Sequence, residues 1–136
     1  MVKVPFSPPH IDNKIITEVV DALQSGWITT GPKTKEFERR LASFVGISNV
    51  LCVSSNSAGL ELMLRWFGVQ PGDEVIVPAY TYCATANVVV HCGATPVMVD
   101  VNPDFNIAVE NVKKAITPKT KVIMPVDIGG FPCDYD

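Results

Sequence analysis

Two polar clusters have the residue types and spacing for ligand chemistry. Residues 54–57 (Ser-Ser-Asn-Ser) stand where an apolar stretch ends and a helical pattern begins. Free backbone N–H groups and the helix dipole at such a point attract an anion, typically a phosphate. Tyr80 and Tyr82 follow a second apolar stretch, residues 74–78, and the Tyr82 ring can stack on a flat ring. Since parallel strands hold ligands beyond their carboxyl ends, each cluster is a candidate part of a ligand site.

Each cluster also has a purely structural interpretation. Ser55 or Asn56 can serve only as the N-cap of the helix that follows. Tyr82 can be a partly buried aromatic whose hydroxyl finds a partner within the fold. Thr81 can cap the helix that begins at this point. Caps and buried tyrosines are common, so the residues alone leave both interpretations open.

The elements that must position these residues alternate between strand and helix. Four strands are predicted, at residues 49–54, 74–78, 96–100 and 121–126. Three helices are predicted between them, at residues 57–67, 82–92 and 108–116. Strands separated by helices of this length indicate parallel βαβ units, and therefore an α/β fold.

The chain before these units has a helical pattern. A helix capped by Asp12 or Asn13 and a second helix with Pro32 in its first turn form a predicted helical arm over residues 1–46. Residues 47–136 contain the βαβ units. We predict that the whole chain is a single segment, which is the default at this length.

Composition and missing motifs exclude several classes of function. The net charge is −3 and the Lys and Arg residues are scattered, which argues against nucleic acid as a partner. No apolar run reaches about 18 residues, so no membrane span is predicted. The four cysteines have no zinc spacing and are interpreted as reduced thiols in a cytoplasmic protein, and His91 as structural, so no metal is expected. Neither GxGxxG nor GxxxxGK[ST] occurs, so the phosphate sites of these two motifs are not supported.

Five blocks in one order carry a resemblance to a known family. The blocks are GWITTGP (26–32), SSNSAGLEL (54–62), PGDEVIVPAYTYCAT (71–85), GATPVMVDV (93–101) and TKVIMPVDIGGFPCDYD (120–136). Together they resemble the amino-terminal part of the DegT/DnrJ/StrS family of sugar aminotransferases, fold-type-I enzymes that use pyridoxal phosphate (PLP). The resemblance implies a parallel-strand three-layer sandwich, of which this chain would be an incomplete N-terminal portion of the large domain. It also implies transfer of an amino group, usually from glutamate, to a nucleotide-linked keto sugar in polysaccharide or lipopolysaccharide biosynthesis, by a homodimer.

Site residues follow from the resemblance only where the motifs match. The family's Ser-Gly-Thr-Ala turn stands here as Ser-Asn-Ser-Ala, which implies that the amides of Ser57 and Ala58 and the Ser57 hydroxyl hold the cofactor phosphate, with Asn56 as a further cofactor-binding residue of the same turn. The aromatic residue after the threonine of the third block is Tyr82, which the resemblance places on the pyridine ring. The resemblance further implies that the substrate pocket borders on three residues of the first block, Thr29, Thr30 and Gly31.

Two departures from the family pattern are visible. Many members have a histidine where this chain has Asp127, which bears on sugar specificity. The family's Schiff-base lysine and the aspartate that pairs with the pyridinium nitrogen would lie beyond residue 136, so no catalytic residue is assigned in this chain and the 136 residues alone are predicted to be inactive. The resemblance also leaves the predicted strand 49–54 without a neighbour in this chain, so it would pair anew, exchange between chains or be disordered.

Two other functions stay open on the sequence. A PLP-dependent sugar dehydrase has the same fold but a histidine in place of the catalytic lysine, and that position is not among these residues. A non-catalytic fragment that binds a full-length subunit or a nucleotide sugar is the second alternative. PLP is the expected cofactor of the complete enzyme, whether that enzyme is an aminotransferase or a sugar dehydrase.

Overall fold

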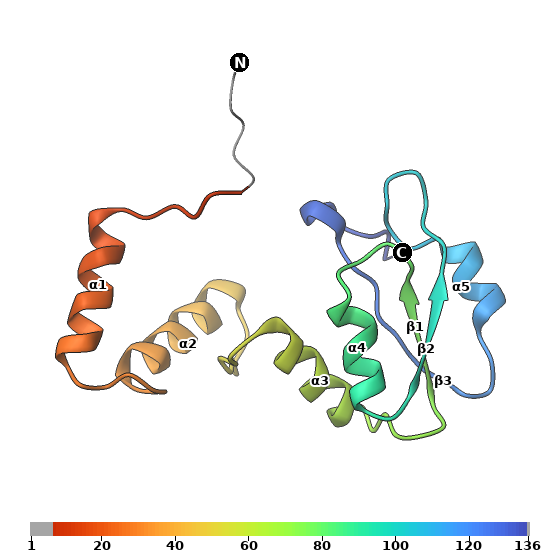
Figure 1. The fold of residues 1–136 in the computed structure, drawn as a ribbon, viewed down its shortest axis with the longest axis horizontal. Coiled ribbons are helices and arrows are strands. Elements are labelled where there is room, and N and C mark those ends of the chain that lie inside the picture. The colour runs from red at the N-terminus through yellow and green to blue at the C-terminus, as the bar shows by residue number, and fades with distance from the viewer. Residues whose placement is uncertain (1–6, 136) are drawn as a thin grey trace, which may run out of the picture. The chain divides into compact units, whose positions relative to one another are not determined.

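The structure is a computed structural model that describes residues 7–135. The chain divides into two compact units, with the boundary between Cys52 and Val53. Figure 1 traces the elements from the N-terminal helices to the sheet of the second unit. The sheet and the candidate site both belong to this second unit.

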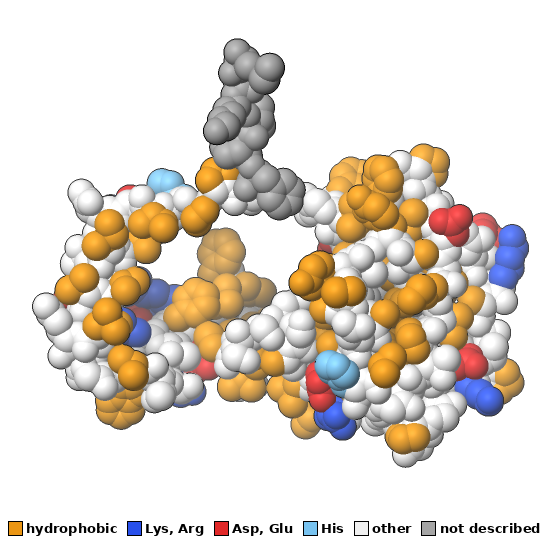
Figure 2. All heavy atoms as spheres, viewed as in Figure 1, with side chains coloured by type: hydrophobic (Ala, Val, Ile, Leu, Met, Phe, Trp, Pro, Cys, Tyr) orange, Lys and Arg blue, Asp and Glu red, His pale blue; other side chains and the backbone are white. Residues whose placement is uncertain are grey.

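The first unit is built from two helices, α1 (Asn13–Gln24) and α2 (Pro32–Val45). Asp12 is the N-cap of α1, because its Oδ1 atom accepts a hydrogen bond from the Ile15 amide at 2.9 Å. Pro32 occupies the first turn of α2, and Gly46 ends this helix with a φ of 76°. These starts agree with the sequence predictions. None of the α1 residues is buried, and Figure 2 shows hydrophobic side chains exposed on both units.

The second unit alternates helix and strand. In chain order its elements are α3 (Asn56–Trp66), β1 (Glu74–Pro78), α4 (Ala84–His91), β2 (Thr95–Val99), α5 (Val109–Ala115), β3 (Thr120–Ile123) and the 3-10 turn η1 (Ile128–Gly130). The strands form a parallel sheet in the order β2-β1-β3. The predicted α/β class with parallel strands is therefore confirmed.

Alternating side chains of β1 build the two cores of this unit. Val75 and Val77 point into one hydrophobic cluster, which includes residues of α3 and α4. Ile76 points into the other, which includes Val112 of α5. Because successive side chains of a strand face opposite sides, one central strand supports helices on both faces. The result is the helix–sheet–helix layering of the predicted sandwich (Figure 1).

The predicted strand at residues 49–54 is wrong. Residues 49–54 are outside the sheet, whose three strands pair only with one another. The Cys52 amide donates instead to Oε1 of Glu38 at 2.9 Å, a side chain that α2 buries. An apolar run can form a strand only where a neighbour offers ladder hydrogen bonds, and no described residue offers them here.

Residues 7–135 offer neither a metal-binding cluster nor a membrane-spanning helix. All four cysteines carry free thiols. Among residues 7–135, none of the helices combines the length and the apolar character that crossing a membrane requires. No three His, Cys, Asp or Glu side chains gather in the same range as a metal-binding group.

Candidate functional site

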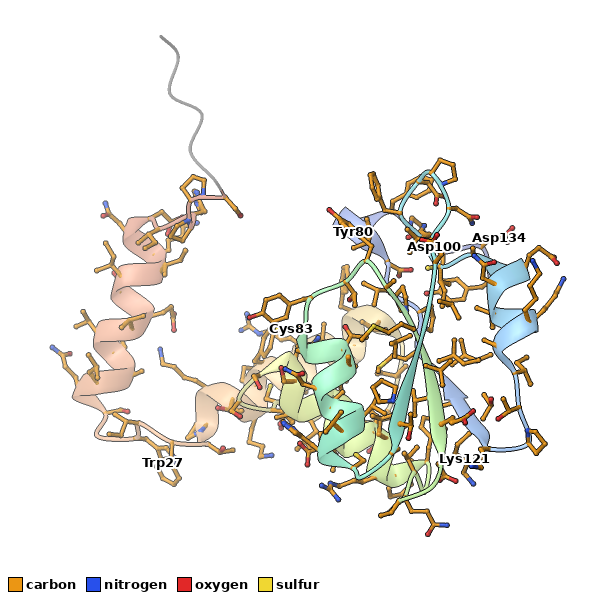
Figure 3. The ribbon with its side chains drawn as sticks, turned by 45° about the vertical axis from the view of Figure 1, so that its right-hand side comes forward. Trp27, Tyr80, Cys83, Asp100, Lys121 and Asp134 are labelled. Carbon is orange, nitrogen blue, oxygen red and sulfur yellow. The ribbon has the colours of Figure 1, made fainter. Side chains whose placement is uncertain are left out.

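A pocket of about 330 Å³ lies where three segments of the second unit meet. The segments are the start of α3, the connection from β1 to α4, and the chain that follows β3. They contribute, among others, Asn56, Thr81, Tyr82, Thr85, Asp127 and Gly129. Figure 3 shows Tyr80 and Asp100 at the end of the sheet to which β1 and β2 point, and Lys121 at the opposite end. The pocket therefore belongs to the carboxyl edge of the sheet, where parallel sheets bind ligands.

The start of α3 offers backbone donors to this edge. Ser55 is the N-cap, and its Oγ atom accepts a hydrogen bond from the Ala58 amide at 3.1 Å. The amides of Asn56 and Ser57 make no hydrogen bond within residues 7–135. Two free N–H groups at the positive end of an 11-residue helix suit an anion. The capping interpretation of Ser55 is thus correct. The cap occupies the Ala58 amide, which was predicted as a phosphate donor, and leaves the amides of Asn56 and Ser57 available.

Tyr82 presents its ring to the pocket rather than to the core. Its side chain is 78% exposed, so the interpretation of Tyr82 as a partly buried aromatic does not hold in this structure. Tyr80, two residues earlier, packs against Phe105 with ring centroids 4.9 Å apart. Of the two tyrosines, Tyr82 is therefore the one free to stack on a ligand.

The predicted capping role of Thr81 is wrong. Helix α4 begins at Ala84, its N-cap is Cys83, and no side chain caps it. The Thr81 hydroxyl pairs with the Thr85 hydroxyl at 2.8 Å instead. A cap at Thr81 requires a helix that begins at residue 82, whereas α4 begins two residues later, at Ala84.

The Asp127 carboxylate, which lines the pocket, is hydrogen-bonded to residues that follow it in the chain. Its Oδ1 atom accepts hydrogen bonds from the Cys133 amide at 2.9 Å and from the Tyr135 hydroxyl at 2.8 Å. Both bonds favour the carboxylate and lower the Asp127 pKa below its ordinary value of 3.8. The same carboxylate, together with burial, raises the pKa of Tyr135 to about 12. The pocket thus has a carboxylate that remains ionised at neutral pH.

These shifts predict a stability window. The pKa of Asp127 is lowered in the folded state, so its contribution to the free energy of unfolding is complete above about pH 3.8. That contribution is lost as the pH falls through the lower pKa of the folded state. Tyr135 has a raised pKa, so its contribution is complete below 10.0 and is lost as the pH rises through about 12. We expect ultraviolet titration to show one of the three tyrosines ionising late, near pH 12. Asp127→Ala should return the pKa of Tyr135 toward its ordinary value of 10.0, and Tyr135→Phe should remove the late step; a late step that survives both changes would contradict the assignment.

The loop predicted to border the substrate pocket belongs to the first unit. Thr29 and Gly31 line a separate cavity of about 220 Å³ there, together with Trp27. The Trp27 indole N–H donates to the Thr30 carbonyl at 2.9 Å. A side chain at position 31 would overlap the Trp27 ring, so glycine is required by close packing at this position. The substrate role of these three residues stays a prediction.

The structure brings part of the predicted site together and adds to it. Asn56 and Tyr82 line one pocket, while Ser57 and Ala58 follow in the first turn of α3. Their roles toward a cofactor stay predictions. Asp127 was expected to bear on sugar specificity but was not among the predicted site residues, although it directly follows the predicted strand 121–126. The observed strand β3 ends earlier, at Ile123. No lysine is among the residues that line this pocket.

Comparison with known proteins gives consistent matches along the chain. A family model described as the DegT/DnrJ/EryC1/StrS aminotransferase family matches residues 9–136. The chain is 43% identical over 134 residues to the spore coat polysaccharide biosynthesis protein SpsC of Bacillus subtilis, a match that covers 98% of this chain and 34% of SpsC.

Solved structures resemble the chain closely. Spr1654 of Streptococcus pneumoniae, assigned as a sugar aminotransferase and solved in its PMP form, is 56% identical with a TM-score of 0.92, over 98% of this chain and 34% of Spr1654. A DegT/DnrJ/EryC1/StrS aminotransferase of Brucella abortus is 34% identical with a TM-score of 0.83, over 90% of this chain and 35% of that one. The chain spans about a third of the length of the curated relatives that it matches.

Proposed function

Since the chain belongs to the DegT/DnrJ/EryC1/StrS aminotransferase family, we propose that its pocket at the carboxyl edge of the sheet binds PLP as part of a sugar aminotransferase. One observation carries the proposal: the pocket joins the start of α3 to the exposed ring of Tyr82. An anion-binding helix start beside a stacking ring is the combination that a phosphorylated pyridine requires. The PLP and PMP forms of Spr1654 support this choice of cofactor.

The residues present fit the cofactor. The free amides of Asn56 and Ser57, with the Ser57 hydroxyl, would hold the phosphate, and Ala58 completes the first turn of α3. The Tyr82 ring would stack on the pyridine. When bound, PLP supplies an electron-accepting ring for chemistry at the carbon next to an amino group. The residues of this chain orient the ring and neutralise the phosphate.

The proposal extends to substrates and partners of the whole protein. We infer a nucleotide-linked keto sugar as the amino acceptor and an amino acid, glutamate, as the donor. The name of SpsC supports a place in polysaccharide biosynthesis. We further propose a cytoplasmic homodimer in which Thr29, Thr30 and Gly31 border the substrate. Because no lysine lines the pocket, we propose that the 136 residues alone bind PLP reversibly and do not transfer amino groups.

Binding of PLP to the purified chain tests the proposal. PLP should bind more tightly than pyridoxal, which has the same ring without the phosphate, when both are measured by equilibrium dialysis. Tyr82→Ala should weaken PLP binding about tenfold, the free energy expected for loss of a stacking ring and its contact area.

Tyr80→Ala provides the matched control. Tyr80 packs on Phe105 and is not among the residues that line the pocket, so its loss should leave PLP affinity unchanged. Equal affinity for PLP and pyridoxal would show that the start of α3 does not bind the phosphate. Equal effects of the two tyrosine variants would show that Tyr82 does not stack on the cofactor.

A further inference from the structure

Asn106 is a buried polar residue outside the pocket, and its side chain forms hydrogen bonds with a segment more than 20 residues later in the chain. It lies in the connection between β2 and α5, and its side chain is 4% exposed. Its Nδ2 atom donates to the carbonyls of Pro132 at 3.1 Å and Phe131 at 3.3 Å. Its Oδ1 atom accepts from the Ile128 amide at 3.3 Å. Both ends of the side-chain amide are therefore used to hold residues 128–132.

The backbone around Asn106 gives this side chain a firm base. The Asn106 amide donates to Oδ1 of Asp104 at 3.0 Å, and its carbonyl accepts from the Asn102 amide at 2.8 Å. Val101 and Ile107 form an antiparallel bridge across the same turn, and Ile107 is buried in the core on the α5 face. The connection is thus anchored to the sheet independently of the segment that it holds.

The segment held by Asn106 forms one wall of the pocket. Asp127 and Gly129 line the pocket, and Gly129 and Gly130 have positive φ angles of 60° and 81°. Two adjacent glycines in this region of backbone space give the turn little stiffness of its own. The Cys133 amide closes the segment on Asp127, so the wall is fixed at two places, from Asp127 and from Asn106.

We propose that Asn106 is a positioning residue for the cofactor pocket: by bonding to residues 128–132 it sets where Asp127 and Gly129 stand in the pocket wall. The consequence for the cofactor rests on the proposed function. The Asn106 side chain bonds neither to the start of α3 nor to Tyr82, because all three of its hydrogen bonds go to the wall segment. Asn106 therefore acts on the wall that contains Asp127 and Gly129, and not on the start of α3, where the phosphate is proposed to bind.

The test compares Asn106→Ala with wild type in the full chain by two measurements. Amide hydrogen exchange at Ile128 and Cys133 should become about tenfold faster, as expected for the loss of hydrogen bonds of ordinary strength, while the core amide of Val89 keeps its protection. PLP affinity should fall about tenfold, whereas affinity for inorganic phosphate should stay unchanged.

Two further variants make the result decisive. Asn106→Asp keeps the acceptor for the Ile128 amide but loses both donors to the carbonyls, so it should also weaken PLP binding. It replaces Asn106→Ala as the test variant if Asn106→Ala lowers the protection of the Val89 amide. Asn87→Ala removes an exposed asparagine of α4 whose side chain makes no hydrogen bond within residues 7–135, and it should change neither measurement.

Each outcome bears on one of the two claims. Unchanged exchange at Ile128 and Cys133, or faster exchange with unchanged PLP affinity, would overturn the positioning role. If wild type binds no PLP at all, the proposed function fails. Faster exchange would then still support the placement of the pocket wall by Asn106.

Discussion

Ser57→Asp is expected to weaken PLP binding at least about a hundredfold and to stabilise the fold at the same time. A carboxylate in the first turn of α3 would lie by the free amides of Asn56 and Ser57 and stabilise the helix by about 0.3–1 kcal/mol. The same charge would repel a phosphate at that point. Two unit charges about 4 Å apart near a protein surface interact by about 4 kcal/mol, which exceeds a hundredfold change in affinity.

Ser57→Asp is expected to lower PLP affinity while it raises the stability of the fold, so general damage to the structure cannot produce the predicted result. PLP affinity is measured by equilibrium dialysis, and stability by urea unfolding followed by circular dichroism. Asn111→Asp is the matched control, because it adds the same charge to the start of α5, a helix that contributes no residue to the pocket. A Ser57→Asp chain that binds PLP as well as wild type would remove the start of α3 from the site.

A strand was predicted correctly where an apolar run in the sequence also has neighbouring strands to pair with in the fold. Residues 74–78 were predicted as a strand and form β1, because an apolar run flanked by turn residues also finds a neighbour on each side. Residues 49–54 have a similar run and form no strand. The difference is pairing, which depends on segments far away in the sequence and has no local signal.

The site was predictable to the extent that it follows from strand ends. Asn56 and Tyr82 were placed at one edge because parallel strands end together, and they line one pocket. The bonds of Asp127 and Asn106 run between segments that no motif connects, and neither was predicted. The Thr81 cap failed for a local reason, since residue identity favours a cap but does not fix the turn at which a helix begins.

Ile76→Ala is expected to destabilise the second unit by about 2–5 kcal/mol, a large fraction of the stability of a small domain. Ile76 lies in the central strand, is fully buried, and packs into the core that includes Val112 of α5. Removing its outer carbons leaves a cavity beneath α5 that neighbours fixed by strand pairing can fill only in part. The urea midpoint of the second unit, followed by hydrogen exchange of its strand amides, measures the effect.

The matched control for this prediction is a large side chain of the neighbouring strand. Met98 lies in β2 next to Val77 in the register and is 63% exposed, so Met98→Ala should change stability by no more than about 0.5 kcal/mol. The comparison separates burial from strand membership, because both residues belong to paired strands of one sheet. If Ile76→Ala cost no more than Met98→Ala, the core on the α5 face would not support the sheet. Ile107 and Cys133, which belong to that core and lie next to Asn106 and to the segment that it holds, would then lack the rigid base on which the pocket wall depends.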